Sequence, residues 1–225
     1  MTSEKIIDIL KNGKIHLSCE LFPPKQGAEL QNSLEIVNKI AASKPSYMSV
    51  TYGAGGSTVG YSAALAKKVE DNGMPALAHL TCVKADEAKL AEVLGQLQGF
   101  GVKNILALRG DIPADMHGEE IGSFAHASEL MRFVKQQGDF CVGGAAYPEG
   151  HPESGSLEQD IENTKYKVDA GVDFLVTQMF FDNTILYNYM FRLLRAGINV
   201  RLGQNPTLNR KTSGILPSGK FPLVF

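Results

Sequence analysis

The chain has 225 residues, a formal net charge of −2 and 44% hydrophobic residues, values typical of a globular protein with one substantial core. With 22 basic and 24 acidic residues and no basic cluster, the composition argues against nucleic acid or an anionic membrane as partner, and it leaves small molecules as ligands. The N-terminus MTSEKIIDIL predicts neither a signal peptide nor a membrane span, and the three cysteines form no CxxC pair, so a cytoplasmic protein with reduced thiols is expected.

Short apolar runs alternate along the chain with longer stretches of helical periodicity. Possible helix caps support this division, because Asp86 and Ser156 precede two of the helical stretches and glycines follow several others. The predicted strands are 15–21, 47–52, 76–82, 104–109, 141–146, 174–178 and 198–200. The predicted helices are 29–42, 58–72, 86–98, 124–137, 157–170 and 183–196.

This alternation implies parallel strands joined by right-handed helical crossovers, in either a doubly wound sheet or a (β/α)8 barrel. Nearly every predicted strand ends in a polar residue. A barrel collects functional groups at the carboxyl ends of many strands, whereas an open sheet concentrates them at one switch point. The predicted fold class is therefore α/β, a TIM-type (β/α)8 barrel.

Glu20 ends the first predicted strand, directly before the segment Leu-Phe-Pro-Pro. Pro23 and Pro24 cannot continue a hydrogen-bonded ladder, so they end the strand and stiffen the loop. A carboxyl group in a partly dry barrel mouth has a raised pKa and is suited to general acid catalysis. The alternative is a salt-bridged or exposed glutamate at a strand end.

The segment LRGD places a cation and a carboxylate after the fourth predicted strand. Gly110 permits a sharp turn, so that Arg109 and Asp111 can both face the mouth of the barrel. A local ion pair between the two is the alternative.

The segment TYGAGGST, residues 51–58, joins a strand to a helix through a glycine-rich turn. Such a turn suits close approach of a ligand to the backbone and to a helix N-terminus. The segment has neither the GxGxxG spacing nor a Walker A lysine, and a tight turn without a ligand is equally compatible with it.

The segment AAYPEGHPES leaves the fifth predicted strand through two prolines. Tyr147 and His151 on a stiff loop suit stacking on a planar ligand, although solvated loop residues are the alternative, as they are for Glu149. The five histidines have no ligand spacing with cysteines or carboxylates, so no metal site is predicted.

The helical stretch 157–170 carries a polar stripe at i, i+3 and i+7. Asp160, Asn163 and Lys167 supply an acceptor, an amide and a cation on one face, which could hold a ribose and a phosphate. A solvated outer face is the alternative.

In chain order, the segments ELFPPK, SVTYGAGGST, HLTC, LRGD, AAYPEGHPES, KVDAG and TQMFFDN resemble the methylenetetrahydrofolate reductases over residues 15 to about 200. The resemblance implies a cytoplasmic, homo-oligomeric flavoprotein of one-carbon metabolism and methionine biosynthesis with a (β/α)8 barrel. Such an enzyme takes hydride from NADH or NADPH and passes it through FAD, in a ping-pong reaction, to 5,10-methylenetetrahydrofolate, which becomes 5-methyltetrahydrofolate. A proline-dehydrogenase-like flavin barrel would share the fold but would not explain LRGD together with ELFPPK.

The resemblance also implies roles for individual residues. Glu20 corresponds to the general acid that helps to open the five-membered ring of the folate to a 5-iminium cation. Asp111 corresponds to the active-site aspartate beside flavin and pterin, and Gln178 to the amide that reads the pterin; these three residues form the substrate-binding set. The implied FAD-binding residues are Thr51, His79, Arg109, Gly110, Asp111, Tyr147 and His151, with Asp160, Asn163 and Lys167 along the ribose and pyrophosphate.

The chain departs from the family pattern at Tyr166, where a second basic residue is common, and above all in its tail. Residues 201–225 contain four basic residues, no acidic residue and no helical period. We therefore expect a barrel catalytic domain over residues 1–200, with about six to seven units, and an atypical tail over 201–225 that is either non-native or an insertion. The tail could close the barrel irregularly, a partner could close it, or the chain could be a truncated fragment with impaired catalysis and weak flavin binding.

Overall fold

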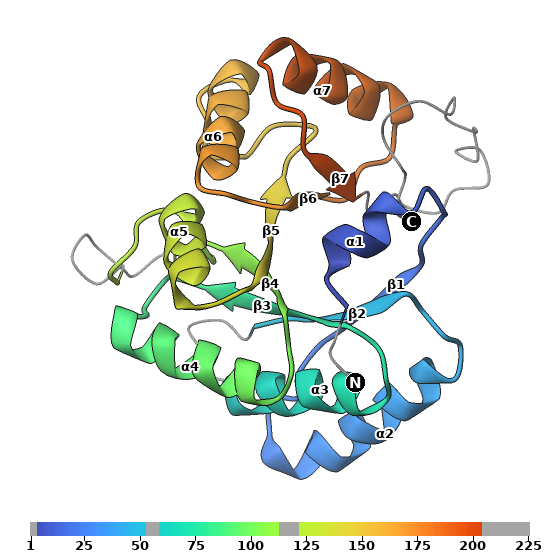
Figure 1. Cartoon of the computed structure of the whole chain (residues 1–225). Coiled ribbons are helices and arrows are strands. Elements are labelled where there is room, and N and C mark those ends of the chain that lie inside the picture. The colour runs from blue at the N-terminus through green and yellow to red at the C-terminus, as the bar shows by residue number, and fades with distance from the viewer. Residues whose placement is uncertain (1–3, 53–58, 113–121, 204–225) are drawn as a thin grey trace.

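The structure is a computed structural model that describes residues 4–52, 59–112 and 122–203. Seven parallel strands form one sheet in which every strand pairs with its neighbours in chain order. Figure 1 shows this sheet curled on itself, with α2 to α7 around its outside. The arrangement confirms the predicted α/β class, since seven strands of a TIM-type barrel are present in the described residues. The strands are β1 (Ser18–Leu21), β2 (Tyr47–Val50), β3 (Ala76–Thr81), β4 (Asn104–Leu108), β5 (Cys141–Ala146), β6 (Phe174–Thr177) and β7 (Arg201–Gly203).

Six helices follow the predicted order between the strands. Asp86 and Ser156 cap two of them, because their side chains accept hydrogen bonds from the backbone N–H groups of Lys89 (2.7 Å) and Gln159 (3.1 Å). The helices are α2 (Leu30–Ala41), α3 (Val59–Asp71), α4 (Glu87–Gly99), α5 (Ala127–Gln137), α6 (Leu157–Asp169) and α7 (Asn183–Arg195), with a short 3-10 turn, η1 (Gly27–Glu29), before α2.

Two features at the ends of the chain differ from the prediction. The seventh strand is not at 198–200 but at Arg201–Gly203. Ile198 instead completes the end of α7, since its N–H donates to the carbonyl of Leu193 (2.9 Å) while Gly197 adopts a left-handed φ of +73°. A short additional helix, α1 (Ile6–Lys11), was not predicted, because six residues carry too little periodic signal.

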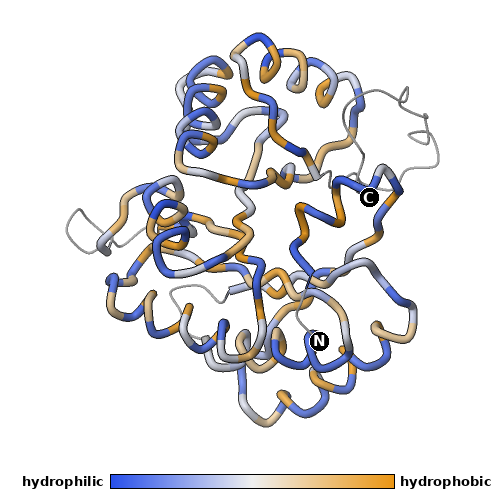
Figure 2. Tube along the Cα trace, in the orientation of Figure 1, coloured by the Kyte–Doolittle hydropathy of each residue, from blue (hydrophilic) through white to orange (hydrophobic). Residues whose placement is uncertain are grey.

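Successive side chains of each strand point alternately into and out of the barrel, and this produces two separate hydrophobic clusters. The residues of the sheet that face inward pack near the amino ends of the strands against Ile6, Ile9 and Leu10 of α1, which closes that end of the barrel. The residues that face outward pack beneath the helices. Figure 2 shows the hydrophobic residues concentrated on the strands and on the helix sides that face them. The inward cluster contains Tyr47, Leu77, Leu106, Cys141 and Phe174.

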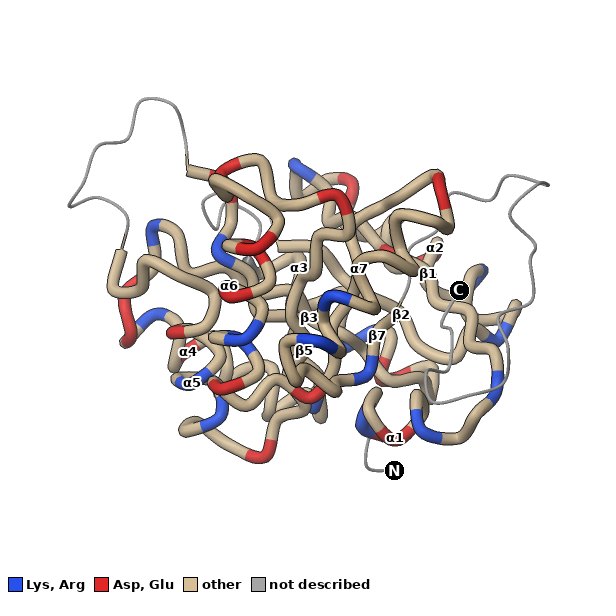
Figure 3. The backbone as a smooth tube through the Cα atoms, turned by 90° about the horizontal axis from the view of Figure 1, so that it is seen from above, with Lys and Arg blue, Asp and Glu red and all other residues tan. Residues whose placement is uncertain are grey.

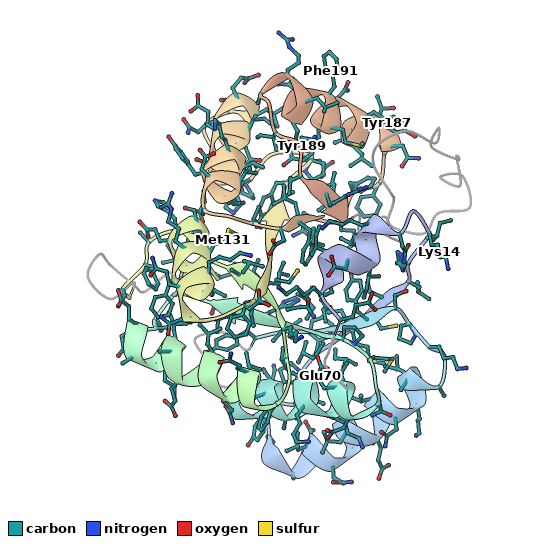
Figure 4. All side chains as sticks on the ribbon, viewed as in Figure 1. Lys14, Glu70, Met131, Tyr187, Tyr189 and Phe191 are labelled. Carbon is teal, nitrogen blue, oxygen red and sulfur yellow. The ribbon has the colours of Figure 1, made fainter. Side chains whose placement is uncertain are left out.

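Helices α6 and α7 contact each other through a buried pair of hydroxyl groups. Tyr189 is 3% exposed, and its hydroxyl lies 3.3 Å from that of Thr164. Burial raises the pKa of Tyr189 to about 12. Figure 4 shows Tyr189 on the inner side of α7 and Phe191 on its outer side, where 61% of Phe191 is exposed.

Acidic and basic residues are interspersed along the described backbone (Figure 3). None of the helices in residues 4–52, 59–112 and 122–203 has both the length and the apolar character needed to cross a membrane.

Two glycines provide a matched test of this packing. At Gly143 an added Cβ would lie 2.6 Å from the Phe174 ring and 3.0 Å from Leu106, inside the closed end of the barrel. At Gly95, on the exposed side of α4, an added Cβ meets nothing within 4 Å. We expect Gly143→Ala to lower the free energy of unfolding by about 1–3 kcal/mol through overpacking. Gly95→Ala should raise it by about 0.5–1 kcal/mol, because alanine is the better helix former.

Urea denaturation of the two variants, with the slope m compared to the parent, measures both effects. Equal stability of the two variants would contradict the inward packing of Phe174 against Gly143.

Candidate active site

A cleft of about 570 Å³ opens at the carboxyl ends of β3, β4 and β5, opposite the end closed by α1. It gathers eight of the ten residues predicted to bind a cofactor, although they come from three separate segments of the chain. They are Arg109, Gly110, Asp111, Tyr147, His151, Asp160, Asn163 and Lys167. The parallel sheet produces this meeting, because it brings all its strand ends to one side.

Arg109 follows β4 at the turn made by Gly110, whose φ is +88°. The close approach of Gly110 to the side chain of Thr81, 3.1 Å from an added Cβ, leaves little room for another residue there. The guanidinium of Arg109 donates two hydrogen bonds of 2.6 Å to the carboxylate of Glu153. This pair raises the pKa of Arg109 and lowers that of Glu153.

In the described residues, Arg109 therefore does not form the local ion pair with Asp111 that was the alternative prediction. The partner of Arg109 is Glu153, from the loop after β5, and Asp111 is exposed at the rim of the cleft.

The polar stripe on α6 faces the cleft and is not a solvated surface. Asp160 is 3% exposed, and its Oδ1 accepts a hydrogen bond from the hydroxyl of Ser154 (3.2 Å), which in turn accepts one from Asn163 (3.4 Å). The second carboxylate oxygen of Asp160, Oδ2, is buried without a partner in the described residues. A buried carboxylate oxygen without a donor is costly, so this position is suited to a hydroxyl group of a ligand.

Lys167 lies next to Asp160 at the inner edge of the cleft. Its ammonium donates to the carbonyl of Ala145 (2.7 Å) and lies 5.5 Å from the centre of the Tyr147 ring. Burial lowers the pKa of Lys167, and the charge of Asp160 partly offsets that effect. The Tyr147 ring also meets His151 edge-on at 4.6 Å, so the two predicted stacking residues lie together.

Glu20 lies at the end of β1, next to two residues on the following strands. Its Oε2 accepts a hydrogen bond from the hydroxyl of Ser49 (3.4 Å) and lies 3.7 Å from Nε2 of His79. Partial burial raises the pKa of Glu20, and the bond from Ser49 partly offsets it. Burial also lowers the pKa of His79 to about 4, so the imidazole is neutral at neutral pH and the contact is not an ion pair.

The remaining predicted residues lie outside the lining of this cleft. His79 faces Glu20, and Thr51 follows β2, where its N–H donates to the carbonyl of Leu21 (2.9 Å). Gln178 is exposed after β6, and its side-chain oxygen accepts from the N–H of Met179 (2.8 Å). Most of the predicted glycine-rich turn, residues 53–58, lies outside the described residues.

Three polar residues of the site were missed by sequence reasoning. Glu153 and Ser154 end the segment AAYPEGHPES, so the signal was the same motif that pointed to Tyr147 and His151. Ser49 precedes Thr51 by two residues, so the two side chains point to the same side of the sheet. This spacing is the sequence signal that could have indicated the contact of Ser49 with Glu20.

Comparison with solved structures shows the fold alone, because the identities are low. A phosphonopyruvate hydrolase superposes with a TM-score of 0.66 at 11% identity over 97% of this chain and 77% of that one. A protein from Clostridium thermocellum, described as binding two copies of 5-methyl-5,6,7,8-tetrahydrofolic acid, superposes with a TM-score of 0.61 at 15% identity, over 90% of this chain and 69% of that one.

Comparison of sequences is more specific. A 5,10-methylenetetrahydrofolate reductase of Escherichia coli is 35% identical over 210 residues, which are 93% of this chain and 67% of that protein. The enzyme of the same name from Pectobacterium carotovorum is 33% identical over 93% of this chain and 66% of its own length, so this chain spans about two thirds of these relatives. Methylenetetrahydrofolate reductase (NADH) 1 of Zea mays is 34% identical over 87% of this chain and 35% of that protein. The family model of methylenetetrahydrofolate reductase matches residues 5–203, and the chain therefore belongs to the methylenetetrahydrofolate reductase family.

Proposed function

We propose that this protein reduces 5,10-methylenetetrahydrofolate to 5-methyltetrahydrofolate, with FAD as cofactor and NADH or NADPH as reductant. The observation that carries the proposal is the cleft at the carboxyl ends of β3 to β5, where a buried carboxylate, a half-buried lysine and an aromatic pair meet. Membership of the family supports the same activity. The activity of the whole enzyme stays a proposal, because the chain spans about two thirds of its bacterial relatives.

The residues of the cleft suit FAD. Its volume, about 570 Å³, lies within the range of cofactor sites. Oδ2 of Asp160 would accept a hydrogen bond from a ribose hydroxyl, Lys167 would hold the pyrophosphate, and Tyr147 with His151 would contact the planar rings. FAD, when bound, carries the hydride between the nicotinamide and the folate.

Residues near the cleft would supply the proton and would bind the pterin and the flavin. Glu20, whose pKa is raised by desolvation, would hold the proton that opens the folate ring. Asp111, which follows β4, would place a negative charge beside the flavin and the pterin. The side-chain amide of Gln178 would form hydrogen bonds with the pterin. Thr51 and His79 would complete the site near the flavin. We assign these roles to a catalytic domain over residues 1–200, in a homo-oligomer.

Replacement of Lys167 by methionine tests the cofactor site. Methionine keeps most of the apolar stem of lysine and removes the charge, so we expect the Kd for FAD to rise roughly 10- to 100-fold, as for the loss of a charge-assisted hydrogen bond of ~1.5–3 kcal/mol. Lys165 on the same helix is exposed and pairs with Asp169, so Lys165→Met is the matched control with an unchanged Kd. Titration of the purified chain with FAD, followed by flavin fluorescence, measures both constants. Equal Kd values in a folded Lys167→Met variant would remove α6 from the cofactor site.

A second candidate follows from the edges of the sheet. Among the described strands, β1 pairs only with β2 and β7 only with β6, so each leaves one edge without a strand partner. Unpaired edges favour association with another chain. A barrel fragment that binds flavin weakly, or that works only in an assembly, would fit this observation. Size-exclusion mass together with flavin stoichiometry separates the two candidates, since only the first predicts one FAD in each chain of a well-defined oligomer.

A further inference from the structure

Two buried side-chain atoms in the described residues have no hydrogen-bond partner, and both lie at the carboxyl end of the sheet. One is Oδ2 of Asp160, which belongs to the proposed cofactor cleft. The other is Nε2 of His79 on β3, a residue only 9% exposed. Buried polar groups are almost always paired, so an unpaired nitrogen in this position calls for an explanation.

The nearest partner for this nitrogen is the carboxyl group of Glu20. Nε2 of His79 lies 3.7 Å from Oε2 of Glu20, and the same oxygen accepts a hydrogen bond from Ser49 (3.4 Å). Glu20 is about half exposed, so a small rotation of its side chain brings Oε2 within hydrogen-bond distance of the imidazole. His79 belongs to β3, which pairs with β2 on one side and with β4 on the other. His79 is therefore the fixed member of the pair.

The charge states of the neighbours limit which groups can donate a hydrogen bond to Glu20. The pKa of His79 is about 4, so its imidazole is neutral in the working range of the protein and carries one N–H. Ser49 and Tyr47 on β2 are the other groups near Glu20; burial raises the pKa of Tyr47, so it is also neutral. None of the lysines or arginines in the described ranges forms an ion pair with Glu20.

From this geometry we propose that His79 is a positioning residue for Glu20: its Nε2–H and the Ser49 hydroxyl both donate to Oε2, which leaves Oε1 as the oxygen that carries the proton. The proposal rests on the proposed function for the use of that proton. When Oε1 releases the proton, the two donors stabilise the resulting carboxylate on its other oxygen. His79 thereby fixes which oxygen acts and limits how far desolvation raises the pKa of Glu20.

The test is the titration of Glu20 itself, observed by ¹³C NMR of the side-chain carboxyl carbon in glutamate-labelled protein. The signal is assigned by its loss in Glu20→Gln. We expect His79→Phe, which keeps the aromatic bulk and removes the donor, to raise the titration midpoint of Glu20 by about one pH unit, a tenfold change in proton affinity. His79→Gln places an amide donor near the position of Nε2 and should restore most of the parent midpoint.

A histidine at the other end of the barrel supplies the control. His16 is buried and bonded to Ser46 (2.9 Å) and Asn12 (2.7 Å), so His16→Phe should lower the melting temperature without moving the Glu20 midpoint. The proposal would be overturned if His79→Phe left the Glu20 midpoint unchanged. It would also be overturned if His79→Gln raised the midpoint as much as His79→Phe does.

The titration decides the proposal even if the protein shows no folate reduction, which would refute only the proposed function. Where folate reduction is measurable, a general acid loses its proton as pH rises through its pKa. A higher pKa in His79→Phe therefore extends the alkaline limb of the kcat profile to higher pH, and kcat itself falls because the carboxyl group is no longer held in one orientation.

Discussion

Glu20→Gln should abolish folate reduction while leaving the oxidation of NADH by bound FAD intact. The amide keeps the size of the carboxyl group and can still accept the hydrogen bond from Ser49, but it has no acidic proton to give. Loss of a general acid typically costs ~10²–10⁴ in rate. The pKa of Glu20 is raised by desolvation, so the parent carboxyl holds its proton to higher pH than an exposed glutamate does.

Anaerobic stopped-flow absorbance separates the two half-reactions. Bleaching of the flavin by NADH reports the first, and recovery of the flavin band after addition of 5,10-methylenetetrahydrofolate reports the second. Glu35→Gln, at an exposed position on α2, is the matched control and should change neither rate. Equal losses in both half-reactions of Glu20→Gln would mean that Glu20 supports the site in general and does not deliver a proton.

Asn104→Leu should be the most destabilising of the substitutions considered. Asn104 is fully buried at the amino end of β4, where its oxygen accepts from the N–H of Ile6 (2.8 Å) and its nitrogen donates to the carbonyls of Glu4 (3.1 Å) and Ala76 (3.3 Å). Leucine has a similar volume but leaves these backbone groups without partners. We expect a loss of about 3 kcal/mol, at ~1 kcal/mol for each hydrogen bond. At 2–4 °C per kcal/mol, this corresponds to a melting temperature lower by about 6–12 °C.

The same substitution at Asn32, an exposed residue of α2, is the control and should change the stability by less than about 0.5 kcal/mol. Hydrogen exchange of the amide of Ile6 reports whether α1 has separated from the sheet in Asn104→Leu. Protection of Ile6 equal to that in the parent would show that Asn104 does not hold α1 in place.

The order of the elements could be predicted because each strand and helix carries its own local signal. Cys141–Ala146 is an apolar run between a glycine-ended helix and a proline, and the strand has those bounds. The signal failed at 198–200, where the two apolar residues Ile198 and Val200 suggested a strand. The backbone there instead completes the end of α7, and strand pairing with β6 begins only at Arg201. A short apolar segment does not reveal which neighbour its backbone will bond to.

The site was predictable in part for the same reason. Residues at strand ends meet because parallel strands share a direction, so Arg109 and Tyr147 could be placed at one cleft from the order of the strands. Side-chain partners depend on distances that the sequence does not contain. The pairing of Arg109 with Glu153 and the contact of His79 with Glu20 both join segments far apart in the chain.

We propose that this chain holds a flavin and passes hydride from a nicotinamide to a folate. The most direct test is the anaerobic absorption spectrum of the purified chain with FAD, taken before and after NADH and again after 5,10-methylenetetrahydrofolate. We expect a stoichiometric flavin band that NADH bleaches and the folate restores, with 5-methyltetrahydrofolate as product. A chain that binds no flavin, or a bleached flavin that the folate leaves unchanged, would contradict it.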